Sequence, residues 1–316
     1  MIAFLISAVR TGMTFLFGST GETLTEKSGN LNLGIPGIMS AGAAFGCAAE
    51  YLYGAAVGKT HVNPTLAVLI PILCAFLGGA LLGLIYCFLT VTLNANQNVT
   101  GLVLTTLGVG LTGYIISKTK SFAFAAKYFT APLPFARNMT GIGKLFLSYG
   151  VMVWLAIAIA LICSWVLSHT RIGLNLRAVG ESPETADAAG INVTRYRYVA
   201  TLIGSGIAGL GGLCYIMDNL FGSWEYTIEA MGWLAIALVI FTTWRPNISV
   251  FASILFGGLY ILYLFIPTGM NLSLKELYKM LPYLVTIVVL IITSLRNKRE
   301  NQPPESLGIA YFRENR

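Results

Sequence analysis

Long apolar runs recur along the whole chain, and they constrain its fold more than any other feature. The hydrocarbon core of a membrane is ~30 Å thick, so a helix that crosses it needs about 20 mostly apolar residues. Candidate runs lie at residues 2–20, 33–56, 64–93, 99–117, 147–168, 198–220, 230–244, 248–267 and 277–295. Hydrophobic residues make up 56% of the chain, and its mean hydropathy is +0.74. We predict an all-α, polytopic integral membrane protein with about nine transmembrane helices, in a range of about eight to ten.

The basic residues indicate how the chain is oriented. Only 10% of the residues are charged, and the net charge is +7. In membrane proteins an excess of Lys and Arg marks cytoplasmic segments, so this charge does not point to nucleic acid. Five basic residues follow the last run: Arg296, Lys298, Arg299, Arg313 and Arg316. We predict a single transmembrane domain over residues 1–295 and a cytoplasmic tail over 296–316. With nine spans the N-terminus would be external, and so would the basic loop at 118–146, against the same rule.

The chain contains no recognisable metal or catalytic motif. Its five cysteines are scattered without a C-x-x-C pair, and His61 and His169 lie in different loops. Metal sites need such ligands at characteristic spacings. The stretch GAAVGKT at 54–60 resembles a phosphate-binding loop, but Tyr53 occupies the position of its first glycine. We therefore expect no enzyme activity and no cofactor bound by this chain, so that any ATP and Mg²⁺ must be bound by a separate subunit.

A second apparent motif, GSGIAG at 204–209, matches the G-x-G-x-x-G dinucleotide pattern. No strand precedes it and its glycines lie within an apolar run, whereas that motif requires a strand followed by a turn and a helix. Small residues in a membrane helix instead allow the close approach of another helix. We predict this packing role for Gly204, Ser205, Ala208, Gly209 and Gly212.

Two polar stretches interrupt the apolar pattern and are candidates for a transport pathway. EKSGNLNLGIPG covers residues 26–37, and LNANQNVTGLVLTTLGVGLTG covers residues 93–113. Irregular backbone at membrane depth is tolerated where it lines a cavity, and amide and hydroxyl groups bind a neutral polar solute without burying a charge. The candidate pathway residues are Asn30, Asn32, Asn96, Gln97, Asn98, Thr100, Thr105 and Thr106.

Both stretches also have a structural interpretation. Residues 26–37 would be an interfacial turn capped by Ser28 and Asn30, and residues 93–98 a cytoplasmic turn followed by threonines that hydrogen-bond between helices. The sequence leaves open whether 93–98 lies at mid-membrane or in the cytoplasm. We expect no charge and no coupling-ion site within the spans. This expectation disfavours a stand-alone secondary transporter or channel, the alternative from another functional class.

Acidic residues in the stretch DNLFGSWEYTIEA form a candidate docking surface on the external side. Asp218, Glu225 and Glu229 could attract the basic face of a soluble binding protein. The alternative is a solvated loop without a partner.

The segment RAVGESPETADAAGINVTRYRY at 177–198 is polar and lies between two apolar runs. Ser182 is a favourable N-cap, Pro183 suits the first helical position, Glu184 lies by the positive helix end, and Gly190 suits the C-terminus. The arginines beside it place this short helix in the cytoplasm. Its alanine-rich face could fit a groove of another protein, and the alternative is a solvated helix in a loop.

The segment LNLRAVGESPETADAAGINVTRYRYVATLIGSGIAGLGG resembles the cytoplasmic coupling segment and following helix of ABC importer permeases for branched-chain amino acids, ribose and nucleosides. The shared pattern is roughly R-A-x-G-x-x-x-x-A-A-x-x-x-G-I. Its matches here are Arg177, Ala178, Gly180, Ala186, Ala189, Gly190 and Ile191. TLTEKSGNLNLGIPGIMSAGA, NQNVTGLVLTTLGVGLTG and the tail QPPESLGIAYFREN are similar to segments of the nucleoside-type permeases. The resemblance thus covers nearly the whole chain, although Pro36 stands where the family has an acid, and no role of that acid is carried over.

The resemblance implies one membrane subunit of an ATP-driven importer in a bacterial cell membrane, which translocates a small neutral polar solute. Nucleosides are the first expectation and ribose-like sugars the second. The expected partners are ABC ATPase subunits, a second homologous permease subunit, and an extracytoplasmic solute-binding protein or lipoprotein. The ATPase-coupling helix is expected to comprise Glu181, Ser182, Pro183, Glu184, Thr185, Ala186, Ala189 and Gly190.

Overall fold

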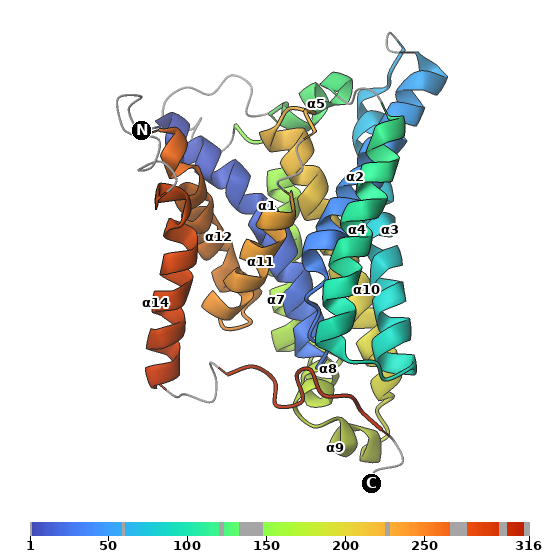
Figure 1. The fold of residues 1–316 in the computed structure, drawn as a ribbon, viewed down its shortest axis with the longest axis vertical. Coiled ribbons are helices and arrows are strands. Elements are labelled where there is room, and N and C mark those ends of the chain that lie inside the picture. Colours follow the sequence, from blue (N-terminus) through green and yellow to red (C-terminus); the bar gives the residue numbers. More distant parts are fainter. Residues whose placement is uncertain are drawn as a thin grey trace.

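The structure is a computed structural model that describes residues 2–58, 61–119, 123–132, 148–224, 228–265, 277–296 and 302–312. All regular secondary structure in these ranges is helical, which confirms the predicted all-α class (Figure 1). Most of the basic loop that was expected on the external side lies outside these ranges, and so does Glu225.

A helix lies over each of the predicted apolar runs. The bundle consists of α1 (Ile2–Lys27), α2 (Ile35–Val57), α3 (Pro64–Cys87), α4 (Gln97–Lys118), α7 (Val151–His169), α10 (Val193–Cys214), α11 (Ile228–Phe241), α12 (Pro246–Ile261) and α14 (Leu281–Arg296). Three short elements continue these helices, namely η1 (Phe88–Thr92), η3 (Tyr215–Asn219) and η4 (Leu262–Leu264). Six described helices are long and apolar enough to cross a membrane, and α11 and α14 are shorter apolar helices. The number of crossings stays a prediction.

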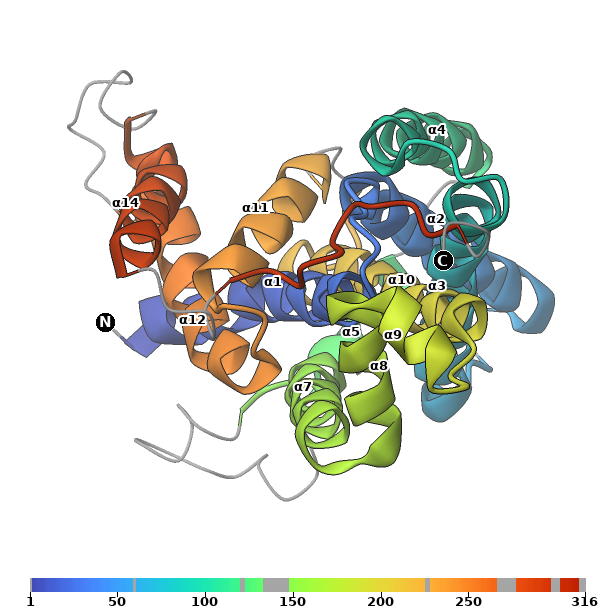
Figure 2. The same cartoon turned by 90° about the horizontal axis from the view of Figure 1, so that it is seen from below.

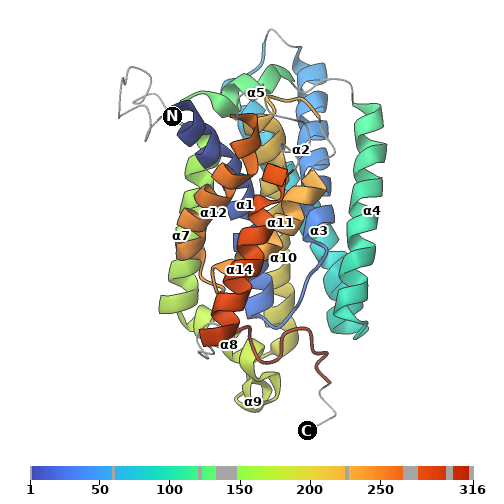
Figure 3. The ribbon, with the colours of Figure 1, turned by 60° about the vertical axis from the view of Figure 1, so that its left-hand side comes forward.

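Helix α1 is the central element of the bundle. It packs against α7, α10, α11 and α12, and every residue from Thr11 to Glu26 is buried. Figures 2 and 3 show α1 passing between a group that contains α2, α3, α4 and α10 and another that contains α11, α12 and α14. A helix that is enclosed on all sides need not present an apolar stripe to lipid. This position explains why α1 can carry polar side chains in its second half.

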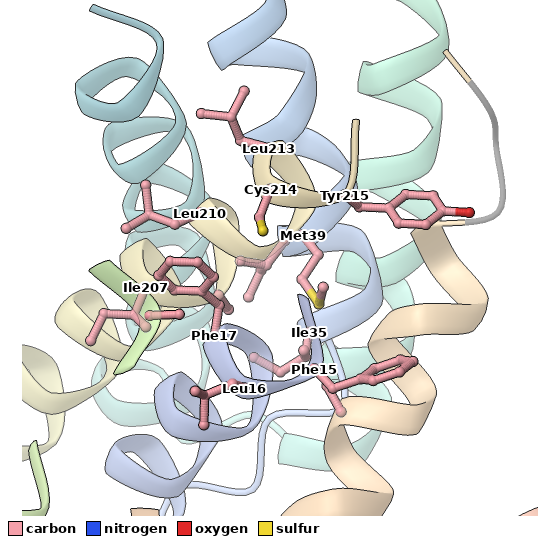
Figure 4. Close-up of a cluster of buried hydrophobic side chains, with 14 of the residues drawn as sticks. Phe15, Leu16, Phe17, Ile35, Met39, Ile207, Leu210, Leu213, Cys214 and Tyr215 are labelled. Atoms are coloured by element: carbon pink, nitrogen blue, oxygen red, sulfur yellow. The ribbon is translucent and has the colours of Figure 1, made fainter. Parts of the chain in front are cut away.

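Aromatic and aliphatic side chains fill the space between α1, α2 and α10. Figure 4 shows part of this buried cluster. Its members include Phe15, Leu16 and Phe17 from α1, Ile35 and Met39 from α2, and Ile207, Leu210 and Leu213 from α10. The core of the protein thus joins the first two helices of the chain to one that begins about 150 residues later, as the helix bounds show.

Glycines allow α2, α3 and α10 to approach one another closely. A Cβ added to Gly42 of α2 would lie 2.4 Å from the Cα of Gly209 on α10. A Cβ added to Gly79 of α3 would lie 2.4 Å from the carbonyl oxygen of Ser205 on α10. Real Cβ atoms do not fit at such distances, so these helices can pack this closely only without side chains. The packing role predicted for the small residues between 204 and 212 is confirmed.

One end of the bundle carries α8 (Arg171–Glu181), α9 (Pro183–Ala188) and residues 302–312, and we call it the α9 end. The N-terminus and α5 (Ala123–Thr130) lie at the opposite end (Figure 1). The loop between α1 and α2, the turn between η1 and α4 and the turn between α11 and α12 also lie toward the α9 end. The irregular backbone of these three connections is therefore gathered beside α8 and α9.

Replacing Gly42 with alanine should destabilise the bundle, because the new Cβ meets the backbone of Gly209. Overpacking of this kind costs about 1–3 kcal/mol. Gly110→Ala on α4 is the matched control, since a Cβ there meets nothing within 4 Å. The control should leave stability unchanged or raise it by up to about 1 kcal/mol through helix propensity. Thermal unfolding of the purified protein in detergent measures both, and equal midpoints for the two variants would contradict the proposed contact.

Candidate functional site

The short helix α9 has the ends that the sequence predicts. The hydroxyl of Ser182 accepts a hydrogen bond from the backbone N–H of Thr185 at 3.4 Å, and Pro183 occupies the first turn. Gly190 follows the helix with a φ of +83°, a value that favours glycine. The N–H of Ile191 then closes the turn on the carbonyl of Ala186 at 3.0 Å. The predicted short helix and its two ends are therefore confirmed, whereas its coupling role stays a prediction.

The two faces of α9 differ from the expectation in one respect. Ala186 was expected on a face that meets a partner, but it is buried in a small apolar cluster with Val179 of α8 and Val193 of α10. Pro183 is also buried. The exposed positions are Glu181, Glu184, Thr185, Ala188, Ala189 and Gly190. The expectation for Ala186 is wrong, because α9 uses that side chain to anchor itself to its own chain.

Helix α8 precedes α9 and was not predicted as a separate helix. Thr170 caps it by accepting a hydrogen bond from the N–H of Gly173 at 3.1 Å. Its buried positions include Gly173, Leu176 and Gly180, which follow the spacing of one helix face. A Cβ on Gly180 would lie 2.3 Å from the carbonyl oxygen of Lys27, so α8 touches the end of α1. This spacing was the available signal for α8.

The first polar stretch forms a buried loop at residues 28–34, which we call the polar loop. Asn30 and Asn32 are both fully buried. The amide of Asn30 donates to the hydroxyl of Thr201 on α10 at 2.9 Å. The side-chain oxygen of Asn32 accepts from the N–H of Gly34 at 2.9 Å. One polar atom of each asparagine is thus paired within the protein, whereas the side-chain oxygen of Asn30 and the side-chain nitrogen of Asn32 have no hydrogen-bond partner among the described residues.

Residues of α3 and α4 hold the backbone of the same loop. The side-chain oxygen of Gln97 accepts from the N–H of Leu31 at 2.7 Å, and the hydroxyl of Tyr86 donates to the carbonyl of Leu31 at 2.7 Å. The hydroxyl of Thr105 donates to the carbonyl of Leu33 at 3.0 Å. The structure therefore brings the candidates from both polar stretches together around the polar loop.

Three candidates from the second stretch lie elsewhere. Asn96, Asn98 and Thr106 are exposed, whereas Thr100 is buried in α4. Asn96 caps α4 by accepting from the N–H of Val99 at 3.1 Å, and the Thr106 hydroxyl donates to the carbonyl of Val103 in its own helix. The turn at residues 93–98 lies at the α9 end. Its residue Asn94 helps to line a cavity of about 910 Å³ beside α9 and the start of α10.

Buried ionisable side chains lie in α1, against the expectation of no charge within the spans. Glu22 and Glu26 are 0% and 2% exposed. Glu22 accepts a hydrogen bond from the N–H of Asn32 at 3.1 Å, and Glu26 accepts one from the indole N–H of Trp244, in the turn between α11 and α12. Arg197 of α10 is also buried. Glu22 and Glu26 follow the apolar part of the first run, so the sequence pattern does not indicate their burial; the helices that enclose α1 place them in the interior.

The predicted docking surface is not formed as expected. Asp218 lies in η3 and is fully buried, so its expected place on an exposed rim is wrong. Glu229 is half-buried in the first turn of α11, and Glu225 lies outside the described residues. Asp218 sits in a helical extension that continues the enclosed face of α10, which is why its acidic character did not bring it to the surface.

Pro36, where the family has an acid, occupies the first turn of α2 and is buried. A Cβ on Gly232 of α11 would lie 2.4 Å from the Cα of Pro36, so the two helices touch at this point. Proline fits a first helical turn because no intrahelical partner is needed for its missing N–H. The substitution is thus compatible with this packing.

Comparison with known proteins identifies the family of this chain. The family described as "Branched-chain amino acid transport system / permease component" matches residues 4–290. The guanosine ABC transporter permease protein NupQ of Bacillus subtilis is 29% identical, over 93% of this chain and 91% of its own length. The nucleoside ABC transporter permease protein NupC of Lactococcus lactis is 32% identical, over 87% of each chain. TsgC13 of Haloferax volcanii, provisionally named a glucose ABC transporter permease protein, is 30% identical, over 98% of this chain and 97% of its own length.

These relatives are named as transport subunits and not as enzymes, and they align with almost the full helical bundle. The chain therefore belongs to the branched-chain amino acid transport system permease family and is a multi-pass membrane permease subunit of an ABC importer.

Proposed function

We propose that this permease subunit imports nucleosides. The support is that NupQ and NupC, which align with most of this chain, are named for guanosine and for nucleosides. Two of the polar side chains exposed on α4, Asn98 and Thr106, carry no charge. Such groups can pair with ribose hydroxyls and base amides without the cost of burying an ion. A sugar is the second candidate, because TsgC13 is named for glucose.

The ATPase subunits that drive an ABC permease dock on α9 in this proposal. The observation that carries it is that α9 lies beyond the ends of the long helices and exposes Glu184, Thr185 and Ala189 (Figure 1). Pro183 and Ala186 anchor the opposite face, so a push on α9 is passed to α8 and α10. ATP and Mg²⁺ are bound by the ATPase subunit, and this chain contributes no nucleotide site.

The α9 end, with residues 302–312, faces the cytoplasm of a bacterial cell. The support is the cluster of basic residues that follows the last apolar run, together with the arginines that flank α9 in the sequence. An extracytoplasmic solute-binding protein or lipoprotein then delivers solute at the opposite end, where α5 and the N-terminus lie.

The solute pathway follows the outer face of α4 and is closed by a second, homologous permease subunit. Asn98 and Thr106 are exposed on this helix, whereas Asn30 and Asn32 are fully buried in the polar loop. Figure 2 places α4 at the edge of the bundle, where a second subunit can pack beside it. A polar hydroxyl such as that of Thr106, further along α4, is better placed against a partner subunit or water than against lipid.

Transport then needs only a change of helix positions. Closure of the ATPases on ATP shifts α9, and the rigid helices tilt so that the pathway opens on the other side. Solute biases this equilibrium only by binding one state more tightly than the other. The permease makes and breaks no covalent bond.

Cells or vesicles that contain this permease with its ATPase and binding protein should take up labelled guanosine or uridine in an ATP-dependent manner. Excess unlabelled nucleoside should compete, and ribose or glucose should not, because in this proposal the pathway recognises both the sugar and the base. Competition by a sugar alone would favour the second candidate. Uptake that continues with an inactive ATPase would contradict the ABC mechanism.

Ala189→Trp should reduce co-purification of the ATPase subunits by roughly tenfold, because a large side chain at an exposed position of α9 disturbs the docked surface at a cost of about 1–3 kcal/mol. Ala56→Trp, at an exposed position near the opposite end of α2, is the matched control. Both variants should remain in the membrane fraction. A normal ATPase pull-down with Ala189→Trp would remove α9 from the docking surface.

Asn98→Ala and Thr106→Val should each raise KM for the solute roughly 2- to 12-fold, which corresponds to the loss of one neutral hydrogen bond. Thr105→Val is the control, because its hydroxyl binds the carbonyl of Leu33 and not the proposed pathway. That control should lower thermal stability and leave KM unchanged. Unchanged uptake kinetics in the first two variants would return α4 to a structural role.

A further inference from the structure

Residues 302–312 cross the α9 end of the bundle and contact several elements that are distant in the sequence. Figures 1 and 2 show this segment, in red, passing from the side of α14 across the end of α1 toward α3 and α9. Pro304 and Ser306 are buried although they lie close to the end of the chain. We call residues 302–312 the tail segment.

On one side the tail segment holds α8 and α9. The backbone N–H and the hydroxyl of Ser306 both donate to the carbonyl of Gly180, at 3.1 and 2.5 Å. This carbonyl belongs to the last turn of α8, where carbonyl groups lack partners within the helix. The hydroxyl of Tyr311 donates to the carboxylate of Asp187 on α9 at 2.9 Å. The tail segment thus caps the C-terminal end of α8 and is hydrogen-bonded to α9, the proposed ATPase-docking helix.

On the other side the tail segment holds the polar loop and two long helices. The N–H of Gly308 donates to the carbonyl of Gly29 at 3.1 Å. The carbonyl of Ile309 accepts from the guanidinium of Arg197 on α10 at 3.3 Å and from the amide of Gln97 on α4 at 3.5 Å. All three partners lie within or beside the elements that surround the polar loop.

Gln97 joins these two sets of contacts through a single side chain. Its amide nitrogen donates to the carbonyl of Ile309 in the tail segment, and its amide oxygen accepts from the N–H of Leu31 in the polar loop.

Arg197 depends on the tail segment for hydrogen bonding. Its side chain is 2% exposed, and its Nε and Nη2 atoms have no hydrogen-bond partner among the described residues. Without the Ile309 carbonyl this buried guanidinium would lose the hydrogen bond that it makes within the described residues, which is costly.

From these contacts we propose that the tail segment is a positioning element for transport, which links α9 mechanically to the polar loop and to α4. The proposal rests on the docking of ATPase subunits on α9. A displacement of α9 pulls on Tyr311 and Ser306, and the same short segment passes it to Gly29, Gln97 and Arg197. Since α4 carries the proposed pathway face, the segment connects the motor with the pathway. It acts inside this chain and does not itself bind the ATPase.

Two shortened chains test this proposal in the complete complex. One ends at residue 301 and lacks the tail segment, and the matched control ends at residue 312 and keeps every contact described above. Three quantities are measured in reconstituted vesicles: the amount of ATPase bound, the rate of ATP hydrolysis and the rate of nucleoside uptake. The decisive readout is the number of solute molecules transported per ATP hydrolysed, because a general loss of folded protein lowers both rates in proportion.

For the chain that ends at residue 301 we expect normal ATPase binding, continued ATP hydrolysis, and a fall of roughly fivefold or more in solute transported per ATP, the lower end of typical coupling between sites. The chain that ends at residue 312 should match the full-length protein. An unchanged ratio would overturn the proposal and leave the segment a stabilising element. Loss of ATPase binding would also overturn it, because the segment would then belong to the docking surface.

Point variants decide the matter if the shorter chain does not reach the membrane. Ser306→Ala combined with Tyr311→Phe removes one hydrogen bond on Gly180 and the bond to Asp187, and it should lower the transport-to-ATP ratio by roughly twofold or more. Ile309→Ala is the control, since this side chain is 58% exposed and the backbone carbonyl that accepts from Arg197 and Gln97 is retained. Equal ratios in the two variants would overturn the proposal. Failure of the proposed docking appears separately, as an Ala189→Trp complex that still binds ATPase.

Discussion

Two buried glutamates at the end of the central helix hold two of the connections between helices. Glu22 fixes the polar loop through the N–H of Asn32, and Glu26 fixes the turn between α11 and α12 through the indole of Trp244. That turn needs support, since Thr243 and Trp244 have φ values of 50° and 57°, which non-glycine residues rarely adopt. A carboxylate in a membrane interior is tolerated only with donors close by. The second half of α1 is therefore polar because it organises two loops.

Several neutral polar side chains hydrogen-bond the backbone of the polar loop. The backbone between α1 and α2 is not helical, so its amide and carbonyl groups need partners from elsewhere. Gln97, Tyr86 and Thr105 supply them, and Asn30 reaches across to Thr201. An amide-rich sequence in a membrane protein can thus satisfy an interrupted helix instead of a solute. Asn98 and Thr106 of α4 are exposed and do not hold this loop, so in our proposal they face the pathway.

Local sequence signals predicted the long helices and α9. The burial of individual side chains and the path of the tail segment depend on long-range packing, which those signals do not contain. Apolar length and capping are properties of neighbouring residues, so the bounds of most helices and the turn at Gly190 followed from the sequence. The direction of Ala186 depends on Val179 and Val193, and the burial of Asp218 depends on the helices around η3. The tail segment binds largely through backbone groups, as at Gly308 and Ile309, which leave no side-chain pattern to recognise.

Gly180 of α8 contacts both the end of α1 and the tail segment. Its missing side chain lets α8 lie against the carbonyl of Lys27, at the end of the helix that carries Glu22 and Glu26. Its own carbonyl accepts both donors of Ser306 in the tail segment. Besides the packing of Ala186 on Val193 of α10, two routes from α8 and α9 to the bundle pass through Gly180. One runs directly to the end of α1, and the other runs through the tail segment to α4 and α10. Both routes begin at Gly180. Of the described glycines in α8, it is the one at which an added Cβ would meet the backbone of α1. A side chain at this position would separate the helix from α1 and move the carbonyl away from Ser306 at the same time.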